Sequence, residues 1–225
     1  MGLRHFKKYI TNPGASFQKK ACRVKGQLKT KIESIKNLTH DDYTSKTIPL
    51  TWEGKPKRYE LINKTIKELG YKKYLEIGCF KDECFSQIEC ENKVGVDPTC
   101  GGNVRLTSDD FFAQNKEKFE FIFIDGLHTY EQVLLDIKNA IDCLEDGGTI
   151  MTHDSLPLKY SHQTVSPSND IWNGDVWKAF VEVRTWDNLD SAVCLIDHGV
   201  GMIRKRANNN KLNINIDQFK NLKYS

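Results

Sequence analysis

Short apolar segments alternate with segments of helical periodicity between residues 59 and 154, and this alternation restricts the fold more than any other feature. The expected strands are 73–78, 93–97, 103–110, 120–125 and 149–154. The expected helices are 58–70, 82–89, 111–117 and 129–144. Strands and helices that alternate at this spacing predict an α/β fold, a doubly wound and mostly parallel sheet with right-handed crossovers.

Two segments add detail to this sheet. Residues 120–125 (EFIFID) are almost continuously apolar, as is typical of a central parallel strand that is covered on both faces. Near the C-terminus, residues 191–197 and 200–205 flank the pair His198-Gly199. We expect them to form a C-terminal antiparallel hairpin.

The chain has 225 residues, enough for one sizeable core with appendages. Residues 1–58 form an N-terminal extension that we expect to be partly helical. The extension is basic, because residues 1–36 hold ten lysines and arginines against one acid. The regular domain covers 59–206, with 155–190 as a cap or insert over the substrate, and 207–225 form a polar C-terminal tail. A basic arm is typical of chains that meet polyanions, although it also serves to dock subunits or improve solubility.

Seven cysteines are present, an odd number, and no CxxC pair occurs among them. We interpret them as reduced packing thiols, which together with the lack of an apolar leader predicts a cytoplasmic protein. No apolar run approaches the roughly 20 residues that span a bilayer, so no transmembrane segment is expected.

Acids, imidazoles and glycines gather where the expected strands end. In open parallel sheets ligands bind beyond the carboxyl ends of the strands, so we expect these side chains to meet. Singly, each could serve a turn or cap a helix; together they predict a site. The set is Glu76, Gly78, Asp97, Ser108, Asp109, Asp110, Asp125, Gly126, His128, His153 and Asp154.

The spacing of Gly78 and Asp97 suits a nucleoside. A glycine turn after the first strand lets the protein backbone approach the ligand, and an acid after the second strand can accept hydrogen bonds from the ribose hydroxyls. The full G-x-G-x-x-G pattern is missing, which disfavours a dinucleotide and its pyrophosphate. A nucleoside without phosphates, such as S-adenosylmethionine, requires less of this loop.

Five motifs in order now resemble the class I S-adenosylmethionine-dependent methyltransferases, specifically a small bacterial and viral, methyltransferase-24-like group. They are LEIGCF, GVDP, SDDFF, FIDGLHTYEQVLLDI and MTHDSLP. The resemblance implies S-adenosyl-L-methionine as cofactor. It places Glu76 and Gly78 beside the methionine portion and Asp97 at the ribose, and Phe80 is a further cofactor-binding candidate. It also places Ser108, Asp109 and Asp110 near adenine, and Asp125 and Gly126 at the methyl-transfer site.

The chain is also similar to metal-dependent O-methyltransferases of the catechol type. That similarity implies a divalent metal, Mg²⁺ or Mn²⁺, on Asp125, His153 and Asp154. The alternative is that His153 and Asp154 only line the pocket.

An alcohol acceptor requires a base or a metal, and histidine is the natural base near neutral pH. His128 is the first candidate base; His153 and Asp154 are the further catalytic candidates. For the acceptor, aromatic, amide and acid groups suit a sugar, a glycan or another polyhydroxylated small molecule. The candidates are His162, Trp172, Asn173, Asp175 and Trp177. The alternative is that Trp172 and Trp177 anchor a cap helix.

Two other functions are left open. The basic arm is compatible with an RNA or DNA methyltransferase, although no nucleic-acid-binding module is recognisable. The arm is also compatible with an inactive scaffold that binds the cofactor and docks on a membrane or a partner. A homo-oligomer is a further possibility that the sequence leaves open.

Overall fold

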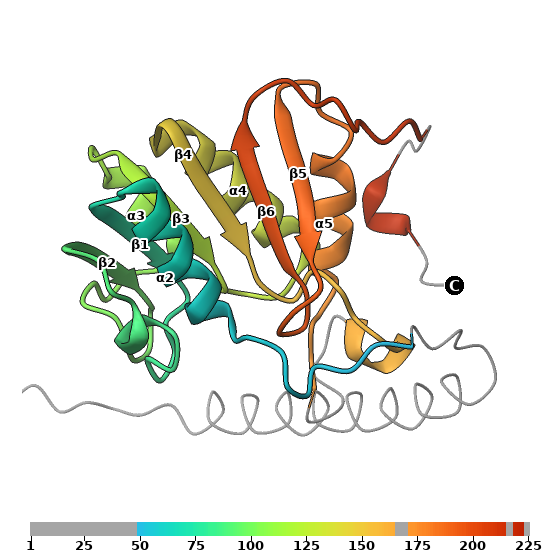
Figure 1. Ribbon diagram of the computed structural model, residues 1–225, viewed down its shortest axis with the longest axis horizontal. Helices are drawn as coiled ribbons and strands as arrows, with labels where there is room; N and C mark the ends of the chain where they lie inside the picture. Colours follow the sequence, from blue (N-terminus) through green and yellow to red (C-terminus); the bar gives the residue numbers. More distant parts are fainter. Residues whose placement is uncertain (1–48, 165–170, 215–217, 223–225) are drawn as a thin grey trace, which may run out of the picture.

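The computed structural model describes residues 49–164, 171–214 and 218–222. Six strands form one sheet in the order β2-β1-β3-β4-β6-β5 (Figure 1). β1 to β4 are parallel, whereas β6 is antiparallel to β4 and to β5. The doubly wound α/β fold and its C-terminal hairpin are therefore confirmed. The strands are β1 Lys73–Ile77, β2 Asn92–Val96, β3 Phe119–Ile124, β4 Leu144–Thr152, β5 Leu189–Cys194 and β6 Val200–Lys205.

Helices cover both faces of the sheet (Figure 1). The central strands carry apolar side chains on each face, and these helices bury them. On one face, α2 packs Ile62 and Ile66 against Phe121 and Phe123. On the other face, α3, α4 and α5 pack against a second set of strand side chains that includes Ile122. The helices are α2 Arg58–Leu69, α3 Ser108–Gln114, α4 Tyr130–Cys143 and α5 Val176–Val183, with short 3-10 turns at Phe85–Gln87, Tyr160–Gln163 and Phe219–Asn221.

The strand predicted at 103–110 is wrong. Only an isolated bridge between Val96 and Val104 forms there, and Thr107 caps α3 by accepting a hydrogen bond from the Asp110 amide at 3.1 Å. The amides of Asn103 and Val104 both donate to the Gly95 carbonyl, at 2.9 Å each, which folds the segment back onto β2. The helix predicted at 82–89 is likewise reduced to the 3-10 turn at Phe85–Gln87.

Part of the segment predicted as a substrate cap belongs to the core. α5 buries Val176, Ala179, Phe180 and Val183 against the sheet and α4. Gly201 of β6 permits this packing, because a Cβ there would collide with the Phe180 ring. Of the described residues between 155 and 190, only 155–164 and 171–175, which precede α5, are placed to cover the carboxyl ends of the strands.

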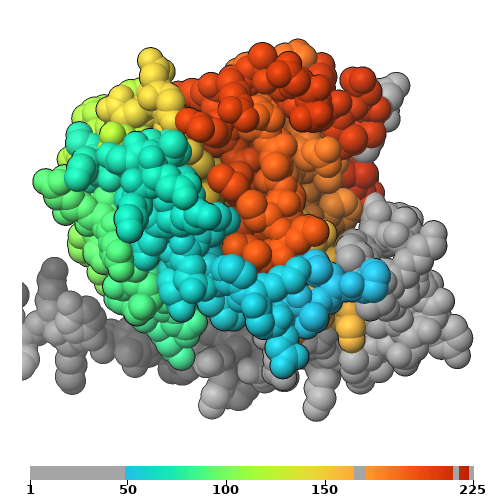
Figure 2. All heavy atoms as spheres, viewed as in Figure 1, coloured from blue at the N-terminus to red at the C-terminus, as the bar shows by residue number. Residues whose placement is uncertain are grey.

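The chain before α2 runs across the turn of the β5–β6 hairpin (Figure 2). Lys55 Nζ donates to the Leu195 carbonyl at 2.8 Å, and the rings of Trp52 and His198 lie 5.6 Å apart. The basic arm of residues 1–48, with its predicted helix, lies outside the described residues. None of the helices in the described ranges combines the length and apolar character that a membrane span requires.

Candidate active site

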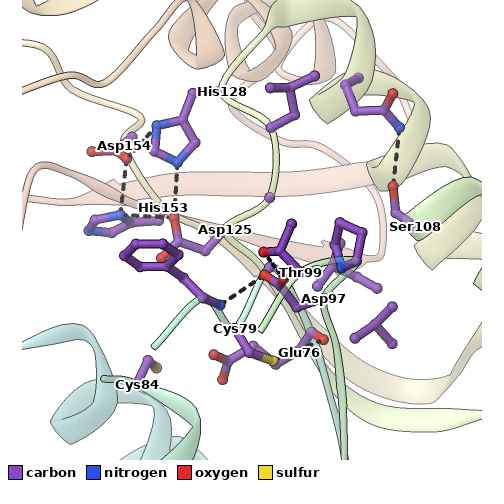
Figure 3. A pocket seen from close by; sticks show the side chains of 18 of the residues that line it. Glu76, Cys79, Cys84, Asp97, Thr99, Ser108, Asp125, His128, His153 and Asp154 are labelled. Atoms are coloured by element: carbon purple, nitrogen blue, oxygen red, sulfur yellow. Dashed lines mark hydrogen bonds and ion pairs between the residues drawn. The ribbon is translucent and has the colours of Figure 1, made fainter. Parts of the chain in front are cut away.

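A cavity of about 790 Å³ opens at the carboxyl ends of β1, β2, β3 and β4 (Figure 3). Its position agrees with the rule that open parallel sheets bind ligands at this edge. Ten of the eleven residues predicted from the strand ends line it, together with Phe80 and Trp172. The predicted residues are Glu76, Gly78, Asp97, Ser108, Asp109, Asp125, Gly126, His128, His153 and Asp154.

Gly78 allows β1 and β3 to approach closely as they leave the sheet. It has φ +87°, and a Cβ would collide with the backbone of Asp125 and Gly126. Only glycine fits this combination of conformation and space. The loop after β1 therefore lies directly against the loop after β3, on the floor of the cavity.

Asp97 is a buried carboxylate held by its own loop and by the loop after β1. Its Oδ1 accepts hydrogen bonds from the amides of Thr99 and Cys100 and from the Thr99 hydroxyl, and its Oδ2 accepts one from the Phe80 amide at 2.9 Å. Burial raises the pKa of Asp97, but these hydrogen bonds outweigh it and leave the pKa below its ordinary value. Oδ2 retains acceptor capacity for a ligand in the cavity.

Glu76 is buried at the end of β1 and accepts a hydrogen bond from the Tyr74 hydroxyl at 2.5 Å. Burial raises the pKa of Glu76 to about 7, against the opposing effect of the Tyr74 hydrogen bond. The carboxyl group therefore changes its charge near neutral pH.

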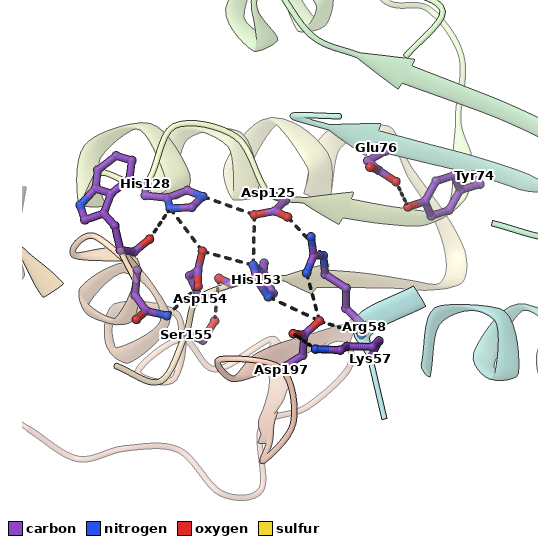
Figure 4. Close-up of polar contacts among 12 residues, drawn as sticks. Lys57, Arg58, Tyr74, Glu76, Asp125, His128, His153, Asp154, Ser155 and Asp197 are labelled. Carbon is purple, nitrogen blue, oxygen red and sulfur yellow. Dashed lines mark hydrogen bonds and ion pairs between the residues drawn. The ribbon is translucent and has the colours of Figure 1, made fainter. Parts of the chain in front are cut away.

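Four residues form a carboxylate–imidazole cluster at the ends of β3 and β4: Asp125, His128, His153 and Asp154 (Figure 4). His128 lies between the two carboxylates, with Nε2 3.3 Å from Asp125 Oδ1 and Nδ1 3.2 Å from Asp154 Oδ2. His153 Nδ1 lies 3.2 Å from each of the same two oxygens. Two acids and two imidazoles thus share one small volume.

Local backbone geometry positions the cluster. Asp154 has φ +56°, a left-handed conformation that aspartate tolerates better than most residues, and it accepts a hydrogen bond from Asn173 Nδ2 at 2.6 Å. Gly174, at φ +63°, lies so close to the His128 carbonyl that a Cβ would collide with it. The Trp172 ring stacks on His128 with centroids 4.9 Å apart. The chain before α5 therefore supports the cluster from outside the sheet.

The neighbouring carboxylates raise the pKa of both imidazoles. Burial lowers the pKa of His153, but Asp125 and Asp154 outweigh it and raise the pKa to about 10. Burial also opposes protonation of His128, and the adjacent carboxylates again raise its pKa above the ordinary value. The pKa of Asp125 falls well below its usual range, because burial is outweighed by His153, His128 and Arg58. His153 is therefore a buried cation at neutral pH.

Comparison with known proteins agrees with this geometry. Residues 75–155, which hold the whole cluster, match the family model described as a methyltransferase domain. The sheet therefore has the fold of the class I methyltransferases, and the match supports an S-adenosylmethionine-dependent methyltransferase.

Solved structures support the fold. The O-methyltransferase from Bacillus cereus in complex with SAH has a TM-score of 0.51 and 11% identity, and the match covers 79% of this chain and 91% of that one. A protein from Klebsiella pneumoniae assigned as an O-methyltransferase has a TM-score of 0.53 at 11% identity, covering 79% and 90%. A Staphylococcus aureus protein assigned as a caffeoyl-CoA O-methyltransferase has a TM-score of 0.52 at 15% identity, covering 77% and 99%. A search of curated protein sequences finds no significant match.

The residues predicted to lie near adenine divide into two groups. Ser108 and Asp109 line the cavity, and Gln132 Nε2 donates to both, at 3.2 and 2.9 Å. Asp110 lies outside the lining; its carboxylate accepts a hydrogen bond from the Thr107 hydroxyl at the start of α3. Since 108–110 begin a helix instead of ending a strand, successive side chains point in different directions.

Of the predicted acceptor residues, only Trp172 lines the cavity. Asn173 supports Asp154 from behind, and Asp175 accepts a hydrogen bond from the Tyr130 amide at 2.7 Å, which joins the start of α4 to the start of α5. Trp177 Nε1 donates to Gln163 Oε1 at 3.0 Å, and the His162 carbonyl accepts from the Asn173 amide at 2.7 Å. These four residues hold the chain around the site in shape.

Arg58 is a lining residue that sequence reasoning missed. It forms ion pairs with Asp125 at 3.5 Å and with Asp197 at 3.0 Å. A cation in the first turn of a helix faces the positive end of the helix dipole, which is unfavourable unless another group compensates. The position of Arg58 in the first turn of α2 was therefore the one feature of the sequence that could have indicated its role.

The cluster also fits a divalent metal. Asp125, His128 and Asp154 each offer one ligand atom, and these atoms lie within 4.8 Å of one another. Carboxylate oxygens with one imidazole suit Mn²⁺, and with waters in the remaining positions Mg²⁺. The predicted ligand His153 contacts the same two carboxylates, but the set of mutually close ligand atoms contains His128 in its place.

Proposed function

We propose that the methyltransferase binds S-adenosylmethionine in the cavity and methylates a hydroxyl group of a sugar, a glycan or another small polyhydroxylated acceptor. The observation that carries the proposal is the position of the carboxylate–imidazole cluster. It lies on the floor of the same cavity as Asp97 and Glu76, where an acceptor hydroxyl would meet the activated methyl group.

The cofactor's orientation follows from the charges. The ribose hydroxyls donate to Asp97 Oδ2, which still accepts on the cavity side. Adenine lies toward Ser108 and Asp109, and the ammonium group of the methionine portion lies at Glu76. This order directs the sulfonium toward Asp125 and the cluster.

Methyl transfer forms an O–CH₃ bond as the S–CH₃ bond breaks, and the hydroxyl must lose its proton. We assign that proton to His128, whose basicity is raised by the carboxylates beside it. His128 must be neutral to accept the proton, so activity should rise with pH as the imidazolium dissociates. Trp172, stacked on His128, keeps the ring in place.

A bound divalent cation offers a second mechanism for the same reaction. Asp125, His128 and Asp154 would hold it, and it would supply Lewis-acid stabilisation of the acceptor alkoxide. Both nitrogens of His128 already face carboxylates, which favours this ligand role. Treatment with a chelator distinguishes the two mechanisms. If His128 acts as a base, activity should remain without metal; if His128 acts as a metal ligand, activity should be lost.

The rim of the cavity favours an acceptor with an apolar face. Phe80 is 58% exposed, Leu127 is 57% exposed, and the Trp172 indole lies beside them in the lining. Exposed apolar side chains around a pocket are typical of ligand-binding sites. The C–H face of a sugar ring fits such a rim while its hydroxyls reach the cluster.

The test is transfer of labelled methyl from S-adenosylmethionine to a panel of nucleotide sugars, oligosaccharides and catechols, with RNA and DNA in parallel reactions. We expect label in hydroxylated small molecules. Label confined to nucleic acid would favour the alternative methyltransferase. Cofactor binding without turnover on any of these acceptors would favour the scaffold.

A further inference from the structure

We propose that Arg58 binds the carboxylate of the amino-acid end of S-adenosylmethionine. The proposal rests on the proposed function, since it assumes that this cofactor fills the cavity. It assigns a cofactor-binding role to a residue outside the matched family region of 75–155.

Part of the Arg58 guanidinium is already fixed by the protein. Nη1 donates to Asp197 Oδ2 at 3.0 Å, and Nε lies 3.5 Å from Asp125 Oδ2 (Figure 4). Nη2 makes no hydrogen bond within the described part of the chain. A guanidinium held on one side, with donors left on the other, is preorganised to bind a carboxylate.

A cavity whose charged side chains are mostly acidic requires a cationic group to bind the carboxylate of the ligand. Its lining holds several acids, and its lysines and arginines among the described residues are Arg58 and Lys81. Lys81 Nζ lies over the ring of Phe80, which is exposed, at 5.2 Å from the centroid. Of these two residues, Arg58 is the one on the inner side, paired with Asp125 just after the end of β3.

An amino-acid zwitterion requires an anion and a cation at neighbouring positions. Glu76 at the end of β1 provides the anion for the ammonium group, and Arg58 at the start of α2 provides the cation for the carboxylate. Asp125 and Asp197 hold Arg58 in place, so the site loses little side-chain entropy when the ligand binds.

The experiment compares two ligands by calorimetry: S-adenosylhomocysteine and 5′-methylthioadenosine, a nucleoside thioether that lacks the amino-acid end. R58M should weaken S-adenosylhomocysteine binding by about 10- to 100-fold, the range for loss of a charge-assisted hydrogen bond. Binding of 5′-methylthioadenosine should change by less than about twofold. R58K, which keeps the charge without the planar fork, should fall between wild type and R58M.

D197N is the matched control, because it removes the charge of the anchor but keeps an amide oxygen that can accept the hydrogen bond from Arg58 Nη1. The ratio of the two affinities should stay close to wild type in D197N. Equal weakening of both ligands in R58M, or no change in either, would overturn the inference alone. Failure of the wild-type protein to bind S-adenosylhomocysteine would instead overturn the proposed function, and the inference with it.

Discussion

At the residue scale, His128 is the side chain on which the proposed chemistry depends. H128A should lower turnover by about 10²–10⁴-fold, because the acceptor hydroxyl loses its proton acceptor or the metal loses a ligand. Affinity for S-adenosylhomocysteine should stay within about twofold of wild type. Initial rates and calorimetry measure the two quantities.

H198N is the control for H128A, since His198 is a histidine outside the cavity lining whose ring lies 6.1 Å from His153. Its turnover should match wild type. Unchanged turnover in H128A would remove His128 from the mechanism. Wild-type activity that survives complete chelation would assign His128 as base; activity restored by added Mn²⁺ would assign it as ligand.

Glu76 should make cofactor binding depend on pH. Burial raises its pKa to about 7, so the carboxyl group is largely neutral below that pH and charged above it. Only the charged form attracts the ammonium group of the ligand. Affinity for S-adenosylhomocysteine should therefore rise as pH increases from about 6 to 8.

The variant E76Q tests this assignment. Its affinity should be lower than that of wild type at pH 8 and nearly independent of pH between 6 and 8. A wild-type affinity that does not change across this range would contradict the role of Glu76. Because 5′-methylthioadenosine lacks the ammonium group, its binding should show no such pH dependence.

At the scale of elements, the chain before α5 holds the cluster in position through Gly174. G174A should place a Cβ against the His128 carbonyl and should lower turnover at least about tenfold. G147A is the matched control: Gly147 has φ +79°, but nothing lies within 4 Å of an added Cβ. In both variants the strain of alanine in a left-handed backbone conformation should lower the free energy of unfolding by about 1–2 kcal/mol.

Thermal unfolding and turnover measured together separate the two effects. G147A should lose stability and keep its turnover. Equal turnover in both variants would show that contact with His128 is unimportant.

The elements also show what sequence reasoning could reach. Residues at the ends of β1, β2, β3 and β4 were predicted to meet, because parallel strands share one edge. The segment 103–110 looked like a strand because its composition alone does not reveal the hydrogen bonds to Gly95. The residues predicted to bind the methyl acceptor were expected to face it, whereas Asn173 and Asp175 turn inward and support Asp154 and α4.

At the scale of the whole molecule, Arg58 and Asp197 join the start of the domain to its C-terminal hairpin. The two residues are 139 positions apart in sequence, so no local pattern could have predicted their contact. Asp197 is only 4% exposed. The ion pair links Arg58, which lines the cavity, to the hairpin.

D197A should destabilise the protein by about 3–5 kcal/mol, because it leaves the largely buried Arg58 beside a missing partner. K57M is the control, since Lys57 is 57% exposed and lies 3.8 Å from Asp197. It should cost less than about 1 kcal/mol. Urea unfolding measures both free energies, and similar values for the two variants would contradict the importance of the buried pair.

The central claim is that the cavity orients S-adenosylmethionine so that its sulfonium faces the carboxylate–imidazole cluster. A crystal structure with S-adenosylhomocysteine tests it most directly. We predict that the ribose hydroxyls contact Asp97 and that the sulfur opens onto Asp125 and His128. A ligand bound elsewhere, or in this cavity with its sulfur turned away from His128, would contradict the account.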